Sequence, residues 1–230
     1  MISNKFTKKV SSFWSKLDKK LDTLVPNETV FRLLAHSKIN LKNKKVLDIG
    51  MSDGANLLEC RKRGAEIFGT DIRKKTVINF YKKYKLKKEN FFVNDLNYSF
   101  PKIKNKLDLV ICKDTICYVD KSRQLQFLHN CSSVLKKDGY ILIQYIQAQL
   151  KQKKRNSLNY KNSLSGKHLK TYHHSDNPIN YLSNKHVKKI IKLSRLNIEE
   201  SIFDTATHTK KDEFGYHIID VNRFLLLKKL

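Results

Sequence analysis

The chain has 230 residues, 40% of them hydrophobic, and a formal net charge of +26 at pH 7. This length suits one α/β domain around a buried sheet, and no apolar run reaches the roughly 18 residues of a membrane span. The four cysteines form no C-x-x-C pair, which favours reduced thiols in a cytoplasmic protein and argues against a metal site.

The basic charge favours anionic partners, nucleic acid among them. Most of the 47 basic residues are lysines spread along the whole chain, whereas dedicated nucleic-acid surfaces use arginine for bidentate contacts. Lysine abundance is also what an AT-rich genome produces. Nucleic acid is therefore not the favoured substrate.

Residues 1–27 are expected to form an N-terminal amphipathic helical extension, and residues 28–230 a single domain. Apolar residues recur at helical spacing from Phe6 to Leu24, with lysines between them. Such a helix either packs on the domain over its ligand pocket, which is the commoner arrangement, or lies on a membrane surface through residues 5–24. A second helix is expected from Thr29 to Ser37. The first ten residues lack the apolar core of a secretory signal.

The segment KVLDIGMSDG, Lys45 to Gly54, predicts a strand, a tight glycine turn and then a helix over Ala55–Arg63. This arrangement brings backbone N–H groups and a helix N-terminus close to a ligand. A second strand, Glu66–Thr70, ends in Asp71, an acid placed to accept hydrogen bonds from ribose hydroxyls. The dinucleotide fingerprint would need glycine at 52, and a phosphate loop is absent. A nucleoside-containing cofactor is indicated.

Further strands are expected at Phe91–Leu96, Leu107–Cys112 and Tyr140–Ile143, the last after a turn at Leu135–Gly139. Strands that alternate with helices predict a parallel sheet covered on both faces, with the ligand at the carboxyl ends of the strands. Acids or glycines fall at four of these ends, at Asp48–Gly54, Asp71, Asp95 and Lys113–Asp114.

This spaced series resembles the class I S-adenosylmethionine-dependent methyltransferases. Their D/E-x-G-x-G-x-G motif is matched by Asp48, Gly50 and Gly54, with Ser52 in place of the middle glycine. Asp114–Val119 resembles small-molecule enzymes of the ubiquinone-biosynthesis type. The resemblance implies a Rossmann-like, doubly wound, seven-stranded sheet, mostly parallel with an antiparallel last strand. The closing strands would be Asn197–Phe203 and Asp220–Leu227.

The resemblance also implies roles for individual residues. Asp48 would fix the glycine loop or bind the cofactor ammonium, Asp71 would hold the ribose, and Ile72 would pack on the adenine. Asp95, with Asn94 as a rival, would contact the adenine edge. The full set of expected cofactor-binding residues is Asp48, Gly50, Met51, Ser52, Gly54, Asp71, Ile72, Asp95, Leu96, Cys112 and Lys113. No metal is required.

The acceptor side is expected in a substrate-side insertion at about 145–180, which is too long for an idle connection. His173 and His174 are the candidates for a base because histidine titrates near neutrality, and Ser183 is the expected N-cap of the next helix. The signature N/D-P-P-Y/F is missing after the fourth strand, which argues against methylation of adenine N6, cytosine N4 or protein glutamine.

The favoured hypothesis is an S-adenosylmethionine-dependent methyltransferase that O-methylates a small molecule or glycan precursor. An RNA methyltransferase, suggested by charge alone, and a non-catalytic cofactor-binding domain are the alternatives.

Overall fold

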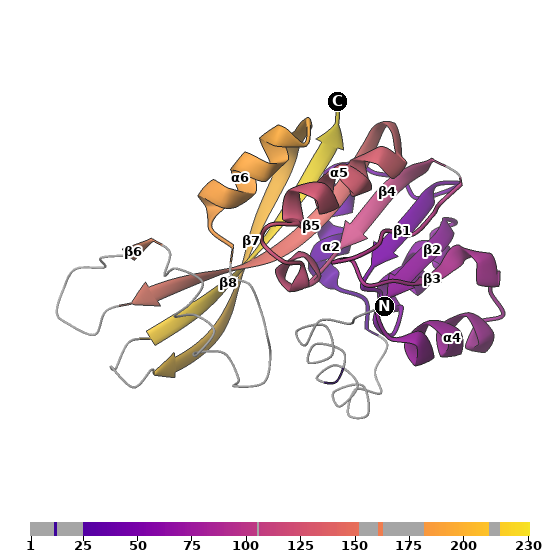
Figure 1. The fold of residues 1–230 in the computed structure, drawn as a ribbon, viewed down its shortest axis with the longest axis horizontal. Coiled ribbons are helices and arrows are strands. Elements are labelled where there is room, and N and C mark those ends of the chain that lie inside the picture. Colours follow the sequence, from indigo (N-terminus) through magenta and orange to yellow (C-terminus); the bar gives the residue numbers. More distant parts are fainter. Residues whose placement is uncertain (1–11, 13–24, 105, 152–160, 163–181, 212–216) are drawn as a thin grey trace.

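The computed structural model describes residues 12, 25–104, 106–151, 161–162, 182–211 and 217–230 (Figure 1). The N-terminal extension expected at residues 1–27 lies almost entirely outside this part. Within it, the helices are too short or too polar to cross a bilayer.

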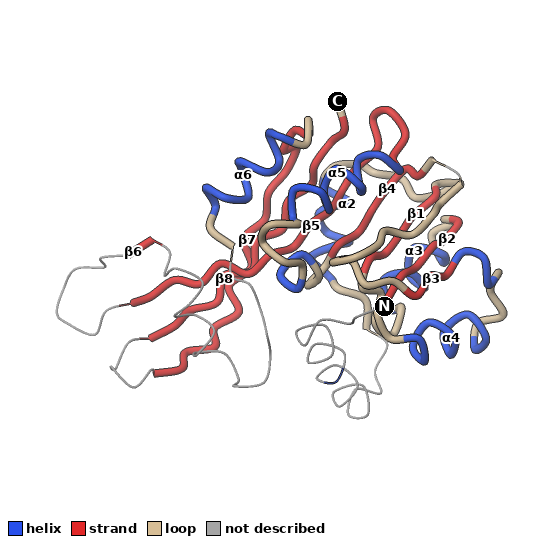
Figure 2. The backbone as a smooth tube through the Cα atoms, in the orientation of Figure 1, coloured by secondary structure: helices blue, strands red, loops and turns tan. Residues whose placement is uncertain are grey.

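One twisted sheet runs through the molecule (Figure 2). Its strands are β1 (Lys45–Ile49), β2 (Glu66–Asp71), β3 (Phe91–Val93), β4 (Leu107–Cys112), β5 (Leu135–Lys151), β7 (Leu196–Lys211) and β8 (His217–Lys229). They are ordered β3-β2-β1-β4-β5-β8-β7, and a two-residue strand, β6 (Lys161–Asn162), pairs with β5 off this path. The first five strands are parallel, while β8 is antiparallel to both of its neighbours. The expected seven-stranded sheet with an antiparallel last strand is confirmed, and β6 is an addition to it.

Helices cover both faces of the sheet. They are α2 (Glu28–His36), α3 (Ala55–Lys62), α4 (Lys74–Lys83), α5 (Gln124–Val134) and α6 (Asn184–Leu193), with short 3-10 turns η1 (Lys88–Asn90) and η2 (Ile116–Tyr118). Successive residues of a strand point to opposite faces. On β1, Leu47 and Ile49 therefore join the core layer under α5 and α6, whereas Val46 joins the layer under α2, α3 and α4.

Two helices begin at side-chain caps. The Asn27 side chain accepts a hydrogen bond from the Val30 amide at 3.0 Å, so α2 starts at Glu28, one residue earlier than expected. The Ser183 hydroxyl accepts one from the His186 amide at 3.2 Å. Each cap satisfies an amide that would lack a partner inside the helix. The expected cap at Ser183 is confirmed.

The strands of the carboxyl-terminal half are longer than expected. β5 begins at Leu135 and not at Tyr140, because the expected turn is a bulge in which Leu107 pairs with Leu135 and Leu109 with Tyr140. β5 also continues to Lys151, because β8 pairs with it as far as Lys151↔His217. The ends of β5, β7 and β8 extend past α6, away from the helices, as a β-ribbon (Figure 1). The first residues of the expected insertion at 145–180 thus belong to a strand.

Candidate functional site

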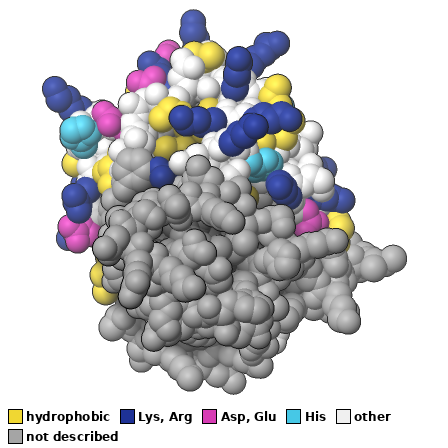
Figure 3. Space-filling model, turned by 90° about the vertical axis from the view of Figure 1, so that its left-hand side faces the viewer, with side chains coloured by type: hydrophobic (Ala, Val, Ile, Leu, Met, Phe, Trp, Pro, Cys, Tyr) yellow, Lys and Arg dark blue, Asp and Glu magenta, His cyan; other side chains and the backbone are white. Residues whose placement is uncertain are grey.

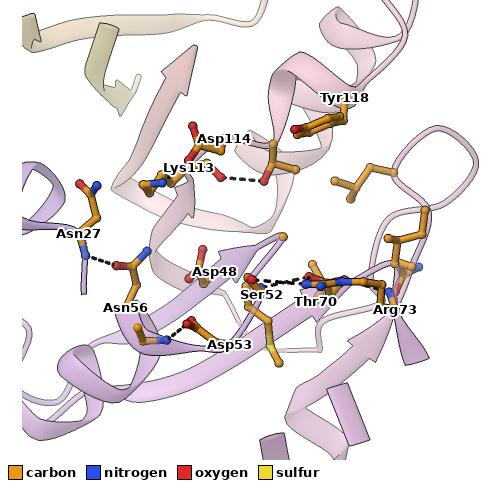
Figure 4. A pocket seen from close by; sticks show the side chains of 18 of the residues that line it. Asn27, Asp48, Ser52, Asp53, Asn56, Thr70, Arg73, Lys113, Asp114 and Tyr118 are labelled. Atoms are coloured by element: carbon orange, nitrogen blue, oxygen red, sulfur yellow. Dashed lines mark hydrogen bonds and ion pairs between the residues drawn. The ribbon is translucent and has the colours of Figure 1, made fainter. Parts of the chain in front are cut away.

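A cavity of about 530 Å³ opens at the carboxyl ends of β1, β2, β3 and β4 (Figure 4). Its lining comes from the loops that follow these strands, from the start of α3 and from the residues before α2. The lining residues are Val25, Pro26, Asn27, Glu28, Asp48, Gly50, Met51, Ser52, Asp53, Ala55, Asn56, Thr70, Asp71, Ile72, Arg73, Asn94, Asp95, Leu96, Asn97, Lys113, Asp114, Thr115, Tyr118 and Val119. This is the place where ligands bind in open α/β sheets.

The loop after β1 is held against β2 and β4. The amides of Gly50 and Met51 both donate to the Thr70 carbonyl, at 2.8 and 3.0 Å. On the other side, the Thr115 hydroxyl donates to the Ile49 carbonyl at 2.8 Å. A Cβ on Gly50 would lie 2.3 Å from the Thr115 Oγ1 atom, so only glycine lets this loop pass beneath the wall made by Thr115.

Two residues expected to bind the cofactor do not line this cavity. Gly54 is the N-cap of α3, with φ +81°, and a Cβ there would lie 2.0 Å from the Phe80 ring. Gly54 therefore allows α3 and α4 to pack closely. The Cys112 side chain is fully buried in the core layer under α5 and α6.

Asp71 forms a buried ion pair with Arg73, and both side chains are 6% exposed. The guanidinium donates from Nε to Oδ1 at 3.0 Å and from Nη2 to Oδ2 at 3.2 Å. The backbone amides of Arg73 and Ser52 donate to the same two oxygens, at 2.9 and 3.1 Å. A carboxylate has about four acceptor positions, so these four bonds engage the whole group.

Asp48 lies at the opposite end of the cavity, where it is buried beside polar side chains. Burial raises the pKa of Asp48 to about 7, against the lowering effects of Lys113 and of a side-chain hydrogen bond with Asn56. The Asn56 side-chain oxygen in turn accepts from the Asn27 amide at 2.9 Å. A buried carboxylate that is costly to ionise gains strongly from a cation placed beside it.

The wall after β4 is fixed by a chain of amides. Asp114 has a positive φ of +53°, which is uncommon for a residue with a side chain. Its backbone N–H donates to the side chain of the buried Gln144 on β5 at 2.6 Å. Gln144 donates onward to Asn222 on β8 at 2.8 Å. The Asp114 carboxylate forms an ion pair with Lys113.

The adjacent wall, at Tyr118 and Val119, is held from α5 and α6. The buried Gln124 side chain donates to the carbonyls of Ile116 and Val119, at 3.3 and 3.1 Å. Its own oxygen lies 2.7 Å from Nε2 of His186, on α6. α6 is thereby connected to the cavity wall through one glutamine.

Asp95 and its neighbours form the cavity edge beyond β3. The Asp95 side chain accepts from the Asn97 amide at 3.0 Å. The Asn97 side chain then accepts from the Asp120 amide at 2.8 Å, so the loops after β3 and after η2 are tied together. Its expected rival, Asn94, also lines the cavity.

The structure thus gathers most of the expected cofactor-binding residues around one cavity. These are Asp48, Gly50, Met51, Ser52, Asp71, Ile72, Asp95, Leu96 and Lys113. The candidate bases His173 and His174 lie outside the described residues. Within the described part of the chain, no three His, Cys, Asp or Glu side chains are grouped to hold a metal ion.

The residues that sequence reasoning missed are mostly polar. Asn27, Asn56, Arg73 and Tyr118 all line the cavity. Arg73 lies two residues after Asp71, which closes the second expected strand, and that proximity was a usable signal. No comparable signal marked Asn27, because it reaches the site through a contact with Asn56, far along the chain.

Comparison with known proteins gives a family for this architecture. A family model described as "Methyltransferase domain" matches residues 13–190. A protein of Methanocaldococcus jannaschii, named as a proposed protein N5-glutamine methyltransferase, is 41% identical over 69 residues, which are 30% of this chain and 32% of that protein. The match therefore spans about a third of that curated relative.

Solved structures share the fold at low sequence identity. Magnesium protoporphyrin IX methyltransferase of Synechocystis PCC 6803, with bound S-adenosylmethionine, has a TM-score of 0.57 and 16% identity, over 99% of this chain and 86% of that one. The Burkholderia thailandensis 1,6-didemethyltoxoflavin-N1-methyltransferase, with 1,6-didemethyltoxoflavin and S-adenosylhomocysteine, has a TM-score of 0.61 and 13% identity, over 97% and 86%.

Proposed function

Because the chain belongs to the methyltransferase-domain family and is an S-adenosylmethionine-dependent methyltransferase, we propose that it methylates an oxygen atom of a small molecule or glycan precursor. The observation that carries the proposal is the convergence of Asp48, Asp71 and Asp95, from three different strand ends, on one cavity of about 530 Å³. A cavity of this size suits small-molecule and cofactor binding.

The methionine part of the cofactor would lie at the Asp48 end. There a buried carboxylate with a pKa of about 7 stands beside Asn56 and Lys113, and a cationic amino group placed beside it favours the ionised form. The glycine loop from Gly50 to Ser52 would follow the cofactor backbone, with no side chain at Gly50 to block the approach.

The ribose would lie at Asp71, with the adenine against Ile72 and its edge at Asp95 and Leu96. Because Arg73 uses both carboxylate oxygens of Asp71, ribose hydroxyls can take those positions only where the guanidinium gives up bonds. We therefore expect binding to exchange at least one Arg73–Asp71 hydrogen bond for a ribose–Asp71 bond.

Methyl transfer itself is an in-line displacement for which the bound cofactor supplies the activated methyl group. The work left to the protein is to orient the acceptor and to receive its proton. Lys113 and Asp114 stand above Asp48 in the cavity wall (Figure 4), and they would flank the reacting centre. His173 and His174 stay candidates for the base.

Four observations bear on the class of the acceptor. The relative named for glutamine methylation favours a protein acceptor, but Lys113-Asp114-Thr115-Ile116 stands where the N/D-P-P-Y/F signature would lie. The net charge of +26 is the sole support for an RNA acceptor. The names of the two similar enzymes of solved structure are those of small-molecule methyltransferases.

The test incubates the protein with methyl-tritiated cofactor and a cell extract, and then separates small molecules, proteins and RNA. Label in the small-molecule fraction supports the proposal when base releases it from an ester or when the labelled product is identified as a methyl ether, whereas a methyl group on nitrogen or carbon contradicts it. Label in protein or RNA contradicts it, and tight cofactor binding without transfer favours a non-catalytic domain.

A further inference from the structure

The outer face of α6 is an uninterrupted row of lysines. Lys185, Lys188, Lys189 and Lys192 are all exposed and follow the i, i+3, i+4, i+7 spacing of one helix face. The opposite face is buried through Val187, Ile190 and Ile191. The helix is thus seated firmly on the domain while its lysines point outward.

Among the described residues these lysines have no acidic partner, unlike Lys44, Lys136 and Lys228. Elsewhere Asp108 is contacted by two lysines, Lys44 and Lys136, and Lys228 pairs with Asp138. No lysine of α6 forms an ion pair with a described acid, and residues 182–198 contain neither Asp nor Glu. Lys121 adds to the charge near α6. Burial is the main cause that lowers the pKa of His186, and the charges of Lys121 and Lys189 lower it further.

Exposed aliphatic side chains stand among these charges. Leu193, beside Lys192, is 50% exposed, and Ile198, at the start of β7, is 42% exposed. Arg195 lies between them in the chain and is exposed as well. Figure 3 views the molecule from the side of α6 and shows that dark blue Lys and Arg side chains outnumber magenta Asp and Glu side chains over the described part of this face, with yellow hydrophobic side chains between them.

We propose that this face, which we call the α6 surface (Lys185, Lys188, Lys189, Lys192, Leu193, Arg195 and Ile198), docks on a membrane that contains anionic lipids. Lysine ammonium groups act as point charges that suit a diffuse layer of anionic headgroups. Aliphatic side chains such as Leu193 and Ile198 can enter the headgroup region between them.

The composition of the surface argues against RNA as its partner. Single-stranded RNA is held by aromatic or arginine planes on which bases stack. Residues 182–198 contain no Phe, Trp or Tyr and one arginine, Arg195. The α6 surface therefore offers charge and aliphatic contact without a stacking platform.

Docking here would also hold the cavity in a defined relation to the membrane. His186, on α6, contacts Gln124, which in turn holds the Val119 carbonyl at the cavity wall. The wall and the α6 surface are therefore connected by two hydrogen bonds that share the Gln124 side chain.

The chain contains a matched control in α4. This helix also exposes four lysines, Lys74, Lys75, Lys82 and Lys83, and contains no acid. In α4 the row of lysines is interrupted by Ile78 and Asn79, and none of the large hydrophobic side chains of this helix is exposed. Replacing either set by Gln changes the net charge equally.

The experiment is flotation of the full chain with vesicles of phosphatidylcholine, with and without about 30% phosphatidylserine. We expect binding only to the anionic vesicles. The α6 variant has Lys185, Lys188, Lys189 and Lys192 changed to Gln, and its affinity for the anionic vesicles should fall by about tenfold or more. The affinity of the α4 variant should fall by less than about threefold. Leu193→Ser alone should weaken binding about threefold.

Equal losses in the two lysine variants would overturn the proposal, since charge alone would then explain the binding. So would full binding by the α6 variant, or no binding by the unaltered chain. A mixed-sequence RNA is included as a competitor at physiological salt, and α6-dependent binding to this RNA without binding to vesicles would assign the surface to nucleic acid. An unchanged melting temperature shows that each variant is folded.

Discussion

The Arg73 guanidinium forms a bidentate pair with the Asp71 carboxylate, with Nε 3.0 Å from Oδ1 and Nη2 3.2 Å from Oδ2. The pair lies at the strand end where a ribose is expected, and each of its two side chains is 6% exposed. Removing one partner of a buried ion pair is costly because the other charge stays buried. Stability and cofactor affinity are therefore coupled at this residue, and double variants can separate them.

Asp71→Ala should lower the free energy of unfolding by about 3–5 kcal/mol and weaken cofactor binding by about 1–3 kcal/mol. In the double variant with Arg73→Met, stability should largely return while affinity stays low. Urea unfolding and calorimetric titration with S-adenosylhomocysteine measure the two effects. Recovery of affinity in the double variant would show that Asp71 does not hold the ribose.

Gly54→Ala should destabilise the protein more than Gly64→Ala. Both glycines have positive φ, +81° and +87°, so both variants carry backbone strain of about 1–2 kcal/mol. At Gly54 the new Cβ also meets the Phe80 ring at 2.0 Å, whereas at Gly64 the nearest atom, in Lys42, is 3.4 Å away. The clash should add about 1–3 kcal/mol, measured from urea midpoints. Equal midpoints would contradict the close packing of α3 on α4.

The free energy of unfolding should fall as pH rises from about 4 to about 7, in part because of Asp48. Its pKa is raised from 3.8 to about 7 in the folded state, so the folded protein retains a proton that the unfolded chain has lost. This contribution is largest at acid pH and is lost as pH passes the folded pKa, by up to about 4 kcal/mol. Asp48→Asn should flatten the profile, and an unchanged slope in that variant would assign it to other groups.

Cofactor binding should show the reverse pH dependence. A cationic amino group beside Asp48 favours the carboxylate, so affinity should rise between pH 6 and 8, by at most about tenfold per unit. Titration calorimetry at pH 6 in buffers of different ionisation enthalpy should detect proton release. Asp48→Asn should abolish that release; proton uptake in the unaltered protein would be the opposite of this expectation.

Gln144→Met should lower the free energy of unfolding by about 1–3 kcal/mol, because it leaves the half-buried Asp114 backbone amide and the Asn222 side chain without their partner. Gln126→Met is the control, since Gln126 is a surface residue of α5 bonded to Asn130, and it should change stability by less than about 0.5 kcal/mol. Methyl transfer to the acceptor, once found, should fall in the Gln144 variant more than cofactor affinity does. Loss of affinity alone would contradict a role at the reacting centre.

The sequence predicted the part of the site that depends on strand ends. Parallel strands bring their carboxyl ends to one edge, so an acid after each strand, such as Asp71 and Asp95, is enough to locate the cavity. The same reasoning did not anticipate the positions of Cys112 and Gly54, which are not among the residues that line the cavity. Cys112 is the last residue of β4 and points into the core, and Gly54 is required by Phe80, a contact that local spacing cannot reveal.

The parts that sequence reasoning missed depend on contacts between distant segments. The polar residues after Ile143 lack strand periodicity, yet β5 continues to Lys151 because β8 supplies hydrogen-bond partners along its whole length. Gln144 has no local signature either, because its two partners come from the loop after β4 and from β8. Arg73 was not singled out from the sequence, because only the fold shows its side chain turned back on Asp71.

The amide chain from Asp114 through Gln144 to Asn222 has a consequence for how related sequences can diverge. Position 114 must accept a left-handed backbone, so Asp, Asn or Gly should occur there in homologues that keep this loop. Gln144 donates one hydrogen bond to Asn222, so a substitution at either position is tolerated chiefly when the other position changes too. An alignment of close relatives should therefore show correlated replacement at 144 and 222, inherited as a unit.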